Sequence, residues 1–162
     1  MSEPTHEEQI ETVRSIVKDI RTCMFTTTDA DGTLHASPMT TQETEFDGDA
    51  WFIARTDSET VRNLSARPQV NVSYAGSTSW VSLSGTASVV RDQAKKKELW
   101  NTFTEAWFPG GEDDPDVVTV KVDGTSAQYW DSPGRLAMTM SMVKARVTGD
   151  TPNAGESDTV AL

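Results

Sequence analysis

Two Asp-Gly pairs constrain the fold of this 162-residue chain more than any other feature. Asp31-Gly32 and Asp47-Gly48 each lie between two short runs of apolar and β-branched residues. An Asp-Gly loop of two residues is typical of a tight β-hairpin, because both positions accept positive φ angles. Strands joined in this way must be antiparallel, so a doubly wound parallel sheet is excluded.

The charge balance narrows the class of protein. Acidic residues outnumber basic ones by 25 to 14, which gives a formal net charge of −11. Such a surface repels phosphate backbones and anionic lipids, so a role on nucleic acid or on a membrane surface is disfavoured. No apolar run approaches the ~20 residues that span a bilayer, and the acidic N-terminal stretch has no export signal. With one cysteine, Cys23, and therefore no internal disulfide, we expect a cytoplasmic protein.

Hydrophobic periodicity predicts a chain of short strands with a few helices. Thr5 and Glu8 have the spacing of a capping box at the start of the first helix. Pro38 cannot donate a ladder hydrogen bond, which places its strand at a sheet edge, and Gly85 inside a strand indicates a bulge. The predicted helices are 7–20, 58–66, 92–103 and 134–146; the predicted strands are 21–28, 34–39, 41–46, 50–55, 70–74, 80–90, 117–123 and 126–131.

These short strands are mostly linked as hairpins, and six or seven of them would suffice for a small antiparallel barrel. The sequence therefore predicts a mainly β protein with helices. We expect a single domain over residues 1–149, with an N-terminal helix and a C-terminal helix. Residues 150–162 are rich in Gly, Pro, Asp and Ser, and we expect a flexible tail there.

A hydroxyl-rich corner lies where strand 50–55 leads into helix 58–66. Its side chains are Thr56, Ser58 and Thr60. A helix start offers free N–H groups and a positive dipole end, which attract anions such as phosphate. The same hydroxyls serve equally well as ordinary helix caps, and Arg55 serves equally well in a surface ion pair. Both readings remain open from the residues alone.

No side chain stands out as an acid, a base or a nucleophile. His35 is interpreted as a satisfied or solvated side chain, and Cys23 as a small buried hydrophobe. The acidic loop 112–116 lacks the spacing of an EF-hand, so we predict no metal site there. The chain also has no Ser-His-Asp elbow, no zinc spacing and no Walker loop. The catalytic residues are therefore left unknown.

Several short motifs follow one another in a characteristic order over roughly residues 7–149. They are Pro38-Met39, Asp47-Gly48-x-x-Trp51-Phe52, Thr56-x-Ser58, Trp80-Val81-Ser82-Leu83-Ser84-Gly85, Trp107-Phe108-Pro109-Gly110-Gly111, Asp114-Pro115-Asp116 and Ala127-x-Tyr129-Trp130-Asp131. This set resembles the bacterial general stress protein branch of the pyridoxamine 5′-phosphate oxidase-like, FMN-binding split-barrel family. The resemblance implies a six-stranded antiparallel split β-barrel that forms a homodimer, with FMN in grooves between the two subunits.

The resemblance also implies where the cofactor lies. The isoalloxazine ring would follow residues 51–55, the phosphate would lie near residues 56–61, and the Trp107 loop would approach the site. The implied cofactor-binding residues are Ser37, Pro38, Met39, Phe52, Ile53, Ala54, Arg55, Thr56, Ser58, Thr60, Val61 and Trp107. The other tryptophans, which are Trp51, Trp80, Trp100 and Trp130, are interpreted as core or interface residues.

Two positions depart from the pattern that this chain resembles. Relatives often carry Arg immediately before the Pro-Met pair, where this chain has Ser37, and Lys where it has Thr60. Both cations would form charge-assisted hydrogen bonds with a phosphate dianion. Arg55 and Arg62 are the cations that remain in the stretch, so we expect weakly held FMN or a different flavin.

These observations leave three functional hypotheses. The first is a flavin-dependent oxidoreductase that passes electrons or hydride to a small acceptor, with the cofactor supplying the redox chemistry. The second is a non-catalytic flavin-binding stress protein that stores or senses the cofactor. The third is a relative whose pocket takes a deazaflavin or a haem, or is left empty. Oxidation of pyridoxamine phosphate itself is not expected.

Overall fold

The computed structural model describes residues 5–132, 142, 144–146, 148, 149, 151 and 155–162. In chain order the elements are α1 (His6–Val17), β1 (Thr22–Thr28), β2 (Leu34–Thr40), β3 (Asp49–Arg55), α2 (Glu59–Ala66), β4 (Gln69–Ala75), β5 (Ser79–Val90), α3 (Gln93–Leu99), α4 (Thr102–Trp107), β6 (Val117–Asp131) and β7 (Glu156–Ala161). No helix in this part of the chain is long and apolar enough to cross a membrane.

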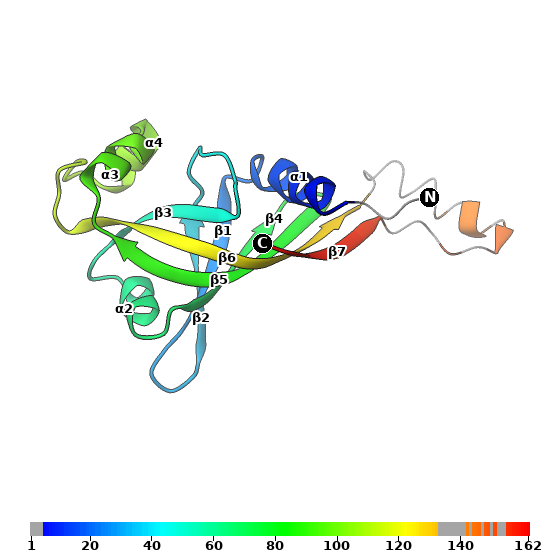
Figure 1. Ribbon diagram of the computed structural model, residues 1–162, viewed down its shortest axis with the longest axis horizontal. Coiled ribbons are helices and arrows are strands. Elements are labelled where there is room, and N and C mark those ends of the chain that lie inside the picture. The colour runs from blue at the N-terminus through cyan, green and yellow to red at the C-terminus, as the bar shows by residue number, and fades with distance from the viewer. Residues whose placement is uncertain (1–4, 133–141, 143, 147, 150, 152–154) are drawn as a thin grey trace.

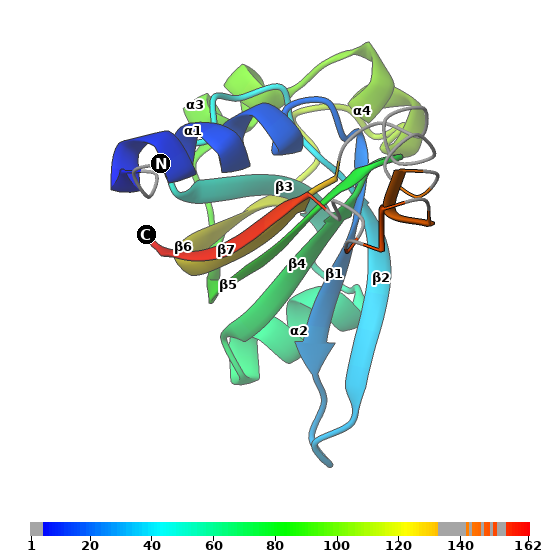
Figure 2. The ribbon, with the colours of Figure 1, turned by 90° about the vertical axis from the view of Figure 1, so that its right-hand side faces the viewer.

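The strands form one antiparallel sheet that curls on itself (Figures 1 and 2). Its order is β2-β1-β4-β5-β6-β3, and β7 adds to β6. β2 and β3 are thus the two ends of the strand path, and some of their Cα atoms lie within 8 Å of each other. Among the described residues no ladder joins β2 to β3, so the barrel keeps one open seam between them.

The long strand β6 holds the barrel together. One edge of β6 pairs with β5, and the other pairs first with β3 and then with β7. The register between β5 and β6 shifts at Ser84/Gly85, which confirms the bulge predicted at Gly85. A β-carbon on Gly85 would lie 2.3 Å from the Asp123 carbonyl oxygen, and one on Gly124 would lie 2.3 Å from that of Gly48. Only glycine allows these strands to cross so closely.

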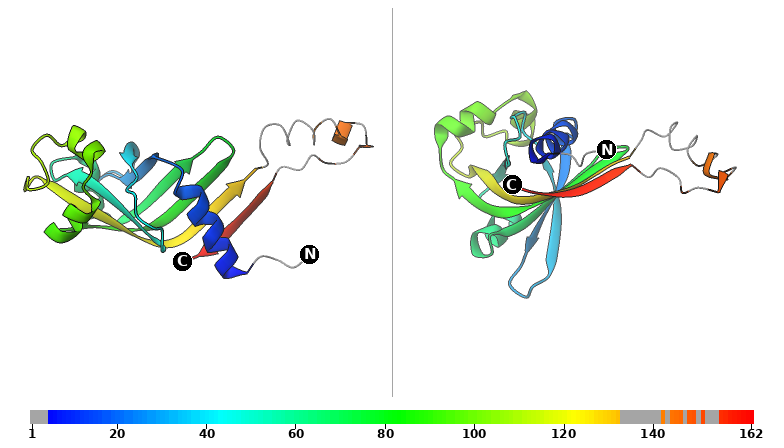
Figure 3. Two further views of the ribbon diagram at one scale, coloured as in Figure 1. Left: turned by 90° about the horizontal axis from the view of Figure 1, so that it is seen from above. Right: turned by 45° about the vertical axis from the view of Figure 1, so that its right-hand side comes forward.

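One hydrophobic core fills the curled sheet. In Figure 1, α1 lies above the sheet and α2 below it, and Figure 3 shows α1 crossing the strands from above. Val13 and Ile16 of α1 and Leu64 of α2 join the same buried cluster as the inward-facing strand residues. Phe25 and Phe52 meet edge to face at its centre, with ring centroids 5.2 Å apart.

Local sequence signals are confirmed where only neighbouring residues are involved. Thr5 and Glu8 form the capping box reciprocally, and Asp31-Gly32 closes the β1–β2 hairpin. Pro38 lies on β2, an end strand of the sheet path. Cys23 is buried, and desolvation raises the pKa of its thiol to about 12, as expected for an inert core cysteine.

The prediction of a β-hairpin at Asp47-Gly48 is wrong. Residues 41–46, here called the strap, form no strand, and β3 pairs with β6 instead. The strap is bound by arginine side chains: Arg14 Nε donates to the Phe46 carbonyl at 2.8 Å, and Arg21 forms an ion pair with Glu43. Phe46 is the one apolar side chain of the strap, and it is buried in the core without any sheet ladder.

Three other expectations need correction. The helix predicted over 92–103 is two short helices, because Trp100 leaves the helical conformation and Asn101 caps α4. The strands predicted over 117–123 and 126–131 are one continuous strand, β6. Within the expected tail, residues 156–161 form β7, because the second half of β6 needs a partner and Val160 is buried in the core. Most of the helix predicted over 134–146 lies outside the described residues.

We expect Gly124→Ala to lower the free energy of unfolding by about 1–3 kcal/mol, the usual cost of forcing an atom into a packed site. The new β-carbon would collide with the Gly48 carbonyl. Chemical denaturation measures the change. The control is Gly32→Ala, where the β-carbon meets open space and only the φ of 89° opposes the substitution. A smaller loss for Gly124→Ala than for Gly32→Ala would contradict the importance of this crossing.

Candidate functional site

The candidate site starts from the two strands that face the open seam. β2 pairs only with β1, and β3 pairs only with β6, among the described residues. Each strand therefore has one edge whose backbone N–H and C=O groups are not used by the sheet. Unpaired edges of this kind can hydrogen-bond to an extended or planar ligand, which makes the seam a candidate binding site.

The two strands meet at a steep angle and are linked at one end of the seam (Figures 1 and 2). The end of β2 leads through the strap to the start of β3. At the other end of the seam, His35 Nδ1 of β2 lies 3.9 Å from Glu59 Oε1, just beyond the end of β3. Ser37, Pro38 and Met39 therefore lie on β2 between the strap and the end of the seam near α2.

The corner, residues 55–61, is built as the sequence predicts. Ser58 is the N-cap of α2: its hydroxyl accepts the Val61 N–H at 3.2 Å and donates to the Arg55 carbonyl at 2.7 Å. The first N–H groups of a helix have no partner inside it. The N–H groups of Glu59 and Thr60 have no acceptor among the described residues, so they remain available to an anion.

A buried lysine forms hydrogen bonds with the acidic loop 112–116 and its end, to which the corner is bonded. Lys96 of α3 is almost fully buried, and its Nζ donates to the carbonyls of Asp114 and Val117, both at 2.9 Å. The Thr56 N–H donates to the Asp116 carbonyl in the same loop at 2.9 Å. The acidic loop thus fixes the corner through its backbone. Sequence reasoning missed Lys96, because nothing local distinguishes it from its exposed neighbours.

An open hollow of about 530 Å³ lies beside the corner. It is lined by Thr56, Val61, Arg62, Ser65, Val89 and Arg91. Arg62 and Arg91 bring two positive charges to the hollow, and Arg91 has no ion-pair partner among the described residues. The sequence pointed to Arg62, one helical turn beyond the corner, but not to Arg91, which arrives from the end of β5.

The structure distributes the other predicted residues over three places. The side chains of Phe52 and Ala54 point into the barrel core, so only their backbone can reach the seam. Ile53 packs on the opposite face of β3, in a smaller cluster with Leu99 and Val117. Arg55 is exposed and forms an ion pair with Asp57 at 3.1 Å. Trp107, at the end of α4, is 68% exposed and does not line the corner hollow.

His35, at the corner end of the seam, lies between two acidic side chains, Asp29 and Glu59. Its Nε2 lies 2.7 Å from Asp29 Oδ2, in the turn region of the β1–β2 hairpin. This hydrogen bond is the main cause of a raised pKa for His35, and Glu59 adds to the effect. Hydrogen bonds from Asp31 and His35 lower the pKa of Asp29. This interaction links β2 to the turn of the β1–β2 hairpin. It agrees with the interpretation of His35 as a satisfied side chain.

The fold and the seam define a split β-barrel with a polar corner beside its opening. The chain belongs to the family described as pyridoxamine 5′-phosphate oxidase like, whose model matches residues 8–153. The seven-stranded sheet therefore corresponds to the expected split barrel, with β7 as an additional strand.

Individual relatives agree with this assignment. Protein bli-3 of Neurospora crassa is 31% identical over 135 residues, which cover 76% of this chain and 65% of that relative's length. The crystal structure of a candidate general stress protein 26 from Jannaschia sp. CCS1 is similar with a TM-score of 0.81 and 26% identity, covering 96% of this chain and 99% of that one. The general stress FMN/FAD binding protein of Xanthomonas citri is similar with a TM-score of 0.66 and 30% identity, covering 77% of this chain and 89% of that one.

The His35–Asp29 pair predicts a pH-dependent stability. Because the pKa of His35 is raised, its contribution is present below the ordinary value of about 6.5 and is lost as the pH rises through the folded-state pKa. Because the pKa of Asp29 is lowered, its contribution is lost only as the pH falls towards the folded-state value. We therefore expect His35→Gln to destabilise the protein more at about pH 5 than at about pH 9. Denaturant unfolding across this range measures the difference, and parallel curves for the two proteins would refute it.

Proposed function

We propose that this protein binds a flavin, FMN first, in the seam between β2 and β3. The observation that carries the proposal is the pair of unpaired strand edges that border the seam, next to the Ser58-capped start of α2. The relative from Xanthomonas citri, which is described as FMN/FAD binding, supports the choice of ligand. The single cysteine supports a cytoplasmic location.

The residues present fit such a cofactor. The free edge of β3 offers backbone donors and acceptors to the polar rim of a flavin ring, with Ser37, Pro38 and Met39 on the facing strand. At the corner, the Ser58-capped start of α2 offers N–H groups to a phosphate. Arg62 and Arg91 line the adjoining hollow and supply the positive charge that Ser37 and Thr60 do not.

A bound flavin would supply hydride or single-electron transfer, and this chain would hold it and exclude water. We propose an oxidoreductase-type role with a small acceptor. A second candidate function is storage or sensing of the flavin without turnover. One observation favours it: Arg55 is the only ionisable side chain among the twelve predicted cofactor-binding residues. Turnover assays with NAD(P)H and artificial acceptors separate the two functions.

The identity of the ligand is tested directly on freshly purified protein. We expect a flavin absorption spectrum, and mass spectrometry of the released ligand should give the mass of FMN. A released deazaflavin or haem would instead support the third hypothesis, in which the pocket of this chain takes a different cofactor. A titration of ligand-free protein with FMN in which no binding occurs would refute the proposal as a whole.

Thr60→Lys should tighten FMN binding about tenfold, because it restores a cation beside the phosphate and a charge-assisted hydrogen bond contributes ~1.5–3 kcal/mol. A fluorescence titration of ligand-free protein with FMN measures the dissociation constant. Thr60→Met is the matched control, since it adds a side chain of similar length without the charge. Equal affinities for Thr60→Lys and Thr60→Met would count against a phosphate at the corner.

Arg62→Gln and Arg91→Gln should each weaken FMN binding several-fold, because each removes one positive charge from the corner hollow. Arg67→Gln is the control. It makes the same change in net charge at the far end of α2, outside the hollow. If all three variants lose affinity equally, the effect is one of overall charge and the two arginines do not bind the phosphate.

We further propose that the protein acts as a homodimer. Large aromatic side chains remain on the surface of the single chain: Trp80 and Trp130 are cross-strand partners at one end of the sheet, and Phe103 and Trp107 lie together on α4. A second copy packed on such surfaces would remove them from water. The family resemblance implies that the Trp107 loop approaches the flavin, and a second copy would allow the exposed Trp107 of one subunit to approach the seam of the other.

Sedimentation velocity at micromolar concentration should show a species of twice the chain mass of 17.7 kDa. Replacing both Trp80 and Trp130 by Ser should shift the equilibrium towards monomer if these aromatics lie in the interface. Leu34→Ser, which removes an isolated exposed apolar side chain on β2, serves as the control. A wild-type profile that is wholly monomeric would contradict the dimer.

A further inference from the structure

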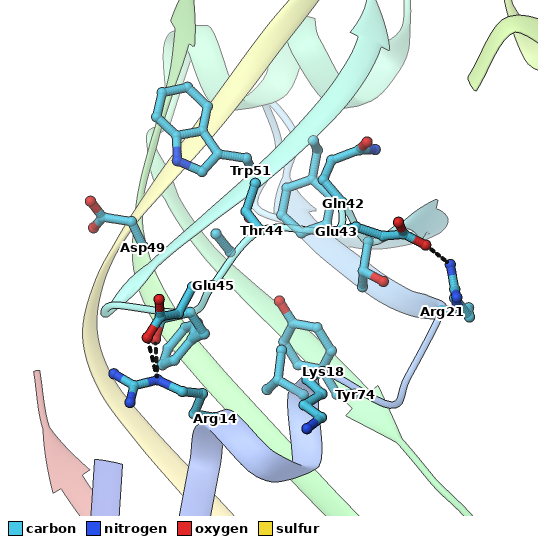
Figure 4. Close-up of a pocket in the computed structure, with 15 residues that line it drawn as sticks. Arg14, Lys18, Arg21, Gln42, Glu43, Thr44, Glu45, Asp49, Trp51 and Tyr74 are labelled. Carbon is cyan, nitrogen blue, oxygen red and sulfur yellow. Dashed lines mark hydrogen bonds and ion pairs between the residues drawn. The ribbon is translucent and has the colours of Figure 1, made fainter. Parts of the chain in front are cut away.

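A second cavity, separate from the corner, opens at the mouth of the barrel. It has a volume of about 460 Å³ and lies between the end of α1, the strap and the start of β3 (Figure 4). Its apolar wall includes Val17, Phe46, Ala50 and Phe52. Cavities of ~300–1,000 Å³ with mostly apolar walls and a few polar groups are typical of small-molecule sites.

The hydroxyl of Tyr74 points into this cavity from β4, towards the strap (Figure 4). Tyr74 is only 2% exposed, and its hydroxyl has no hydrogen-bond partner among the described residues. Burial raises the pKa of this phenol, so it is neutral and both donates and accepts. A hydroxyl that faces a cavity and has no protein partner is available to a ligand or to an ordered water.

Six charged residues line the cavity, of which three are basic and three acidic: Arg14, Lys18, Arg21, Glu43, Glu45 and Asp49. Asp49 is paired with Lys121 outside the lining, and Lys18 has no ion pair among the described residues. Arg14 lies 3.7 Å from Glu45, and Arg21 forms its ion pair with Glu43, so both pairs fasten the strap (Figure 4). These arginines therefore have little charge left to offer a ligand. Gln42 of the strap also lines the cavity. Its Oε1 is buried and has no hydrogen-bond partner among the described residues.

We propose that this strap cavity is a binding site for a neutral bicyclic ring compound that carries a carbonyl oxygen. The aromatic and aliphatic walls receive the ring, and the Tyr74 hydroxyl donates to the carbonyl. Because the lining has as many basic as acidic residues, it disfavours a strongly charged molecule. This site is distinct from the corner hollow, with which it shares no lining residue.

The test compares 1-indanone with indane, two bicyclic compounds that differ by one carbonyl. Protein NMR titration should give a several-fold smaller dissociation constant for 1-indanone, with the perturbed amides on β4, the strap and the start of β3. Tyr74→Phe should weaken 1-indanone about three- to tenfold and leave indane unchanged, as expected for one lost hydrogen bond. Tyr129→Phe is the matched control, because it removes the hydroxyl of the other buried tyrosine, which does not line the cavity.

Three results would overturn the proposal: no binding of 1-indanone by the wild type, equal affinity for both compounds, or an equal loss in Tyr74→Phe and Tyr129→Phe. Ala50→Leu provides a second variant in case Tyr74→Phe does not fold. Its larger side chain should occupy the cavity and abolish binding of both compounds, and retained binding would refute the site. FMN affinity should be unchanged in Tyr74→Phe, so this proposal and the flavin site fail independently.

Discussion

The close crossing of backbone at Gly48, Gly85 and Gly124 is the constraint on which both candidate sites depend. The Gly124 N–H donates to the Gly48 carbonyl at 3.0 Å, one residue before β3 begins. This bond sets where the chain leaves the strap and enters the edge strand. The strap closes the cavity at the barrel mouth, and β3 forms one side of the seam. A displacement of this crossing would therefore move the wall of one site and the edge of the other together.

The sequence was sufficient where the physics is local. The capping residues Thr5 and Ser58 and the turn at Asp31-Gly32 act on neighbours within a few positions, and each was predicted correctly. Asp47-Gly48 gave an equally strong turn signal, but the turn does not join a hairpin because β6 pairs with β3 instead. β7 was missed for the same reason: its stability comes from β6, a partner far away in sequence, and not from its own composition.

The candidate site shows the same limit for charged residues. Ser58 and the start of α2 are recognisable in sequence, because a cap and its helix are contiguous. Arg91 reaches the corner hollow only because β5 is long enough to end beside α2, and Lys96 is identified only by its two buried carbonyl acceptors. The net charge of −11 says nothing of these local cations. Basic residues that lie far apart in sequence can therefore come together in an acidic protein and form a site suited to an anion, and no short sequence motif reveals them.

The two sides of the seam are chemically unequal, which bears on where a planar ligand would dock. Proline has no N–H, so it is tolerated where its nitrogen faces away from the neighbouring strand. Pro38 pairs with Met24 of β1, and its nitrogen therefore belongs to the seam side of β2, which lacks a donor at that point. β3 contains no proline and keeps every donor on its free edge. A planar ring that alternates donors and acceptors along one side is therefore matched better by the free edge of β3 than by that of β2.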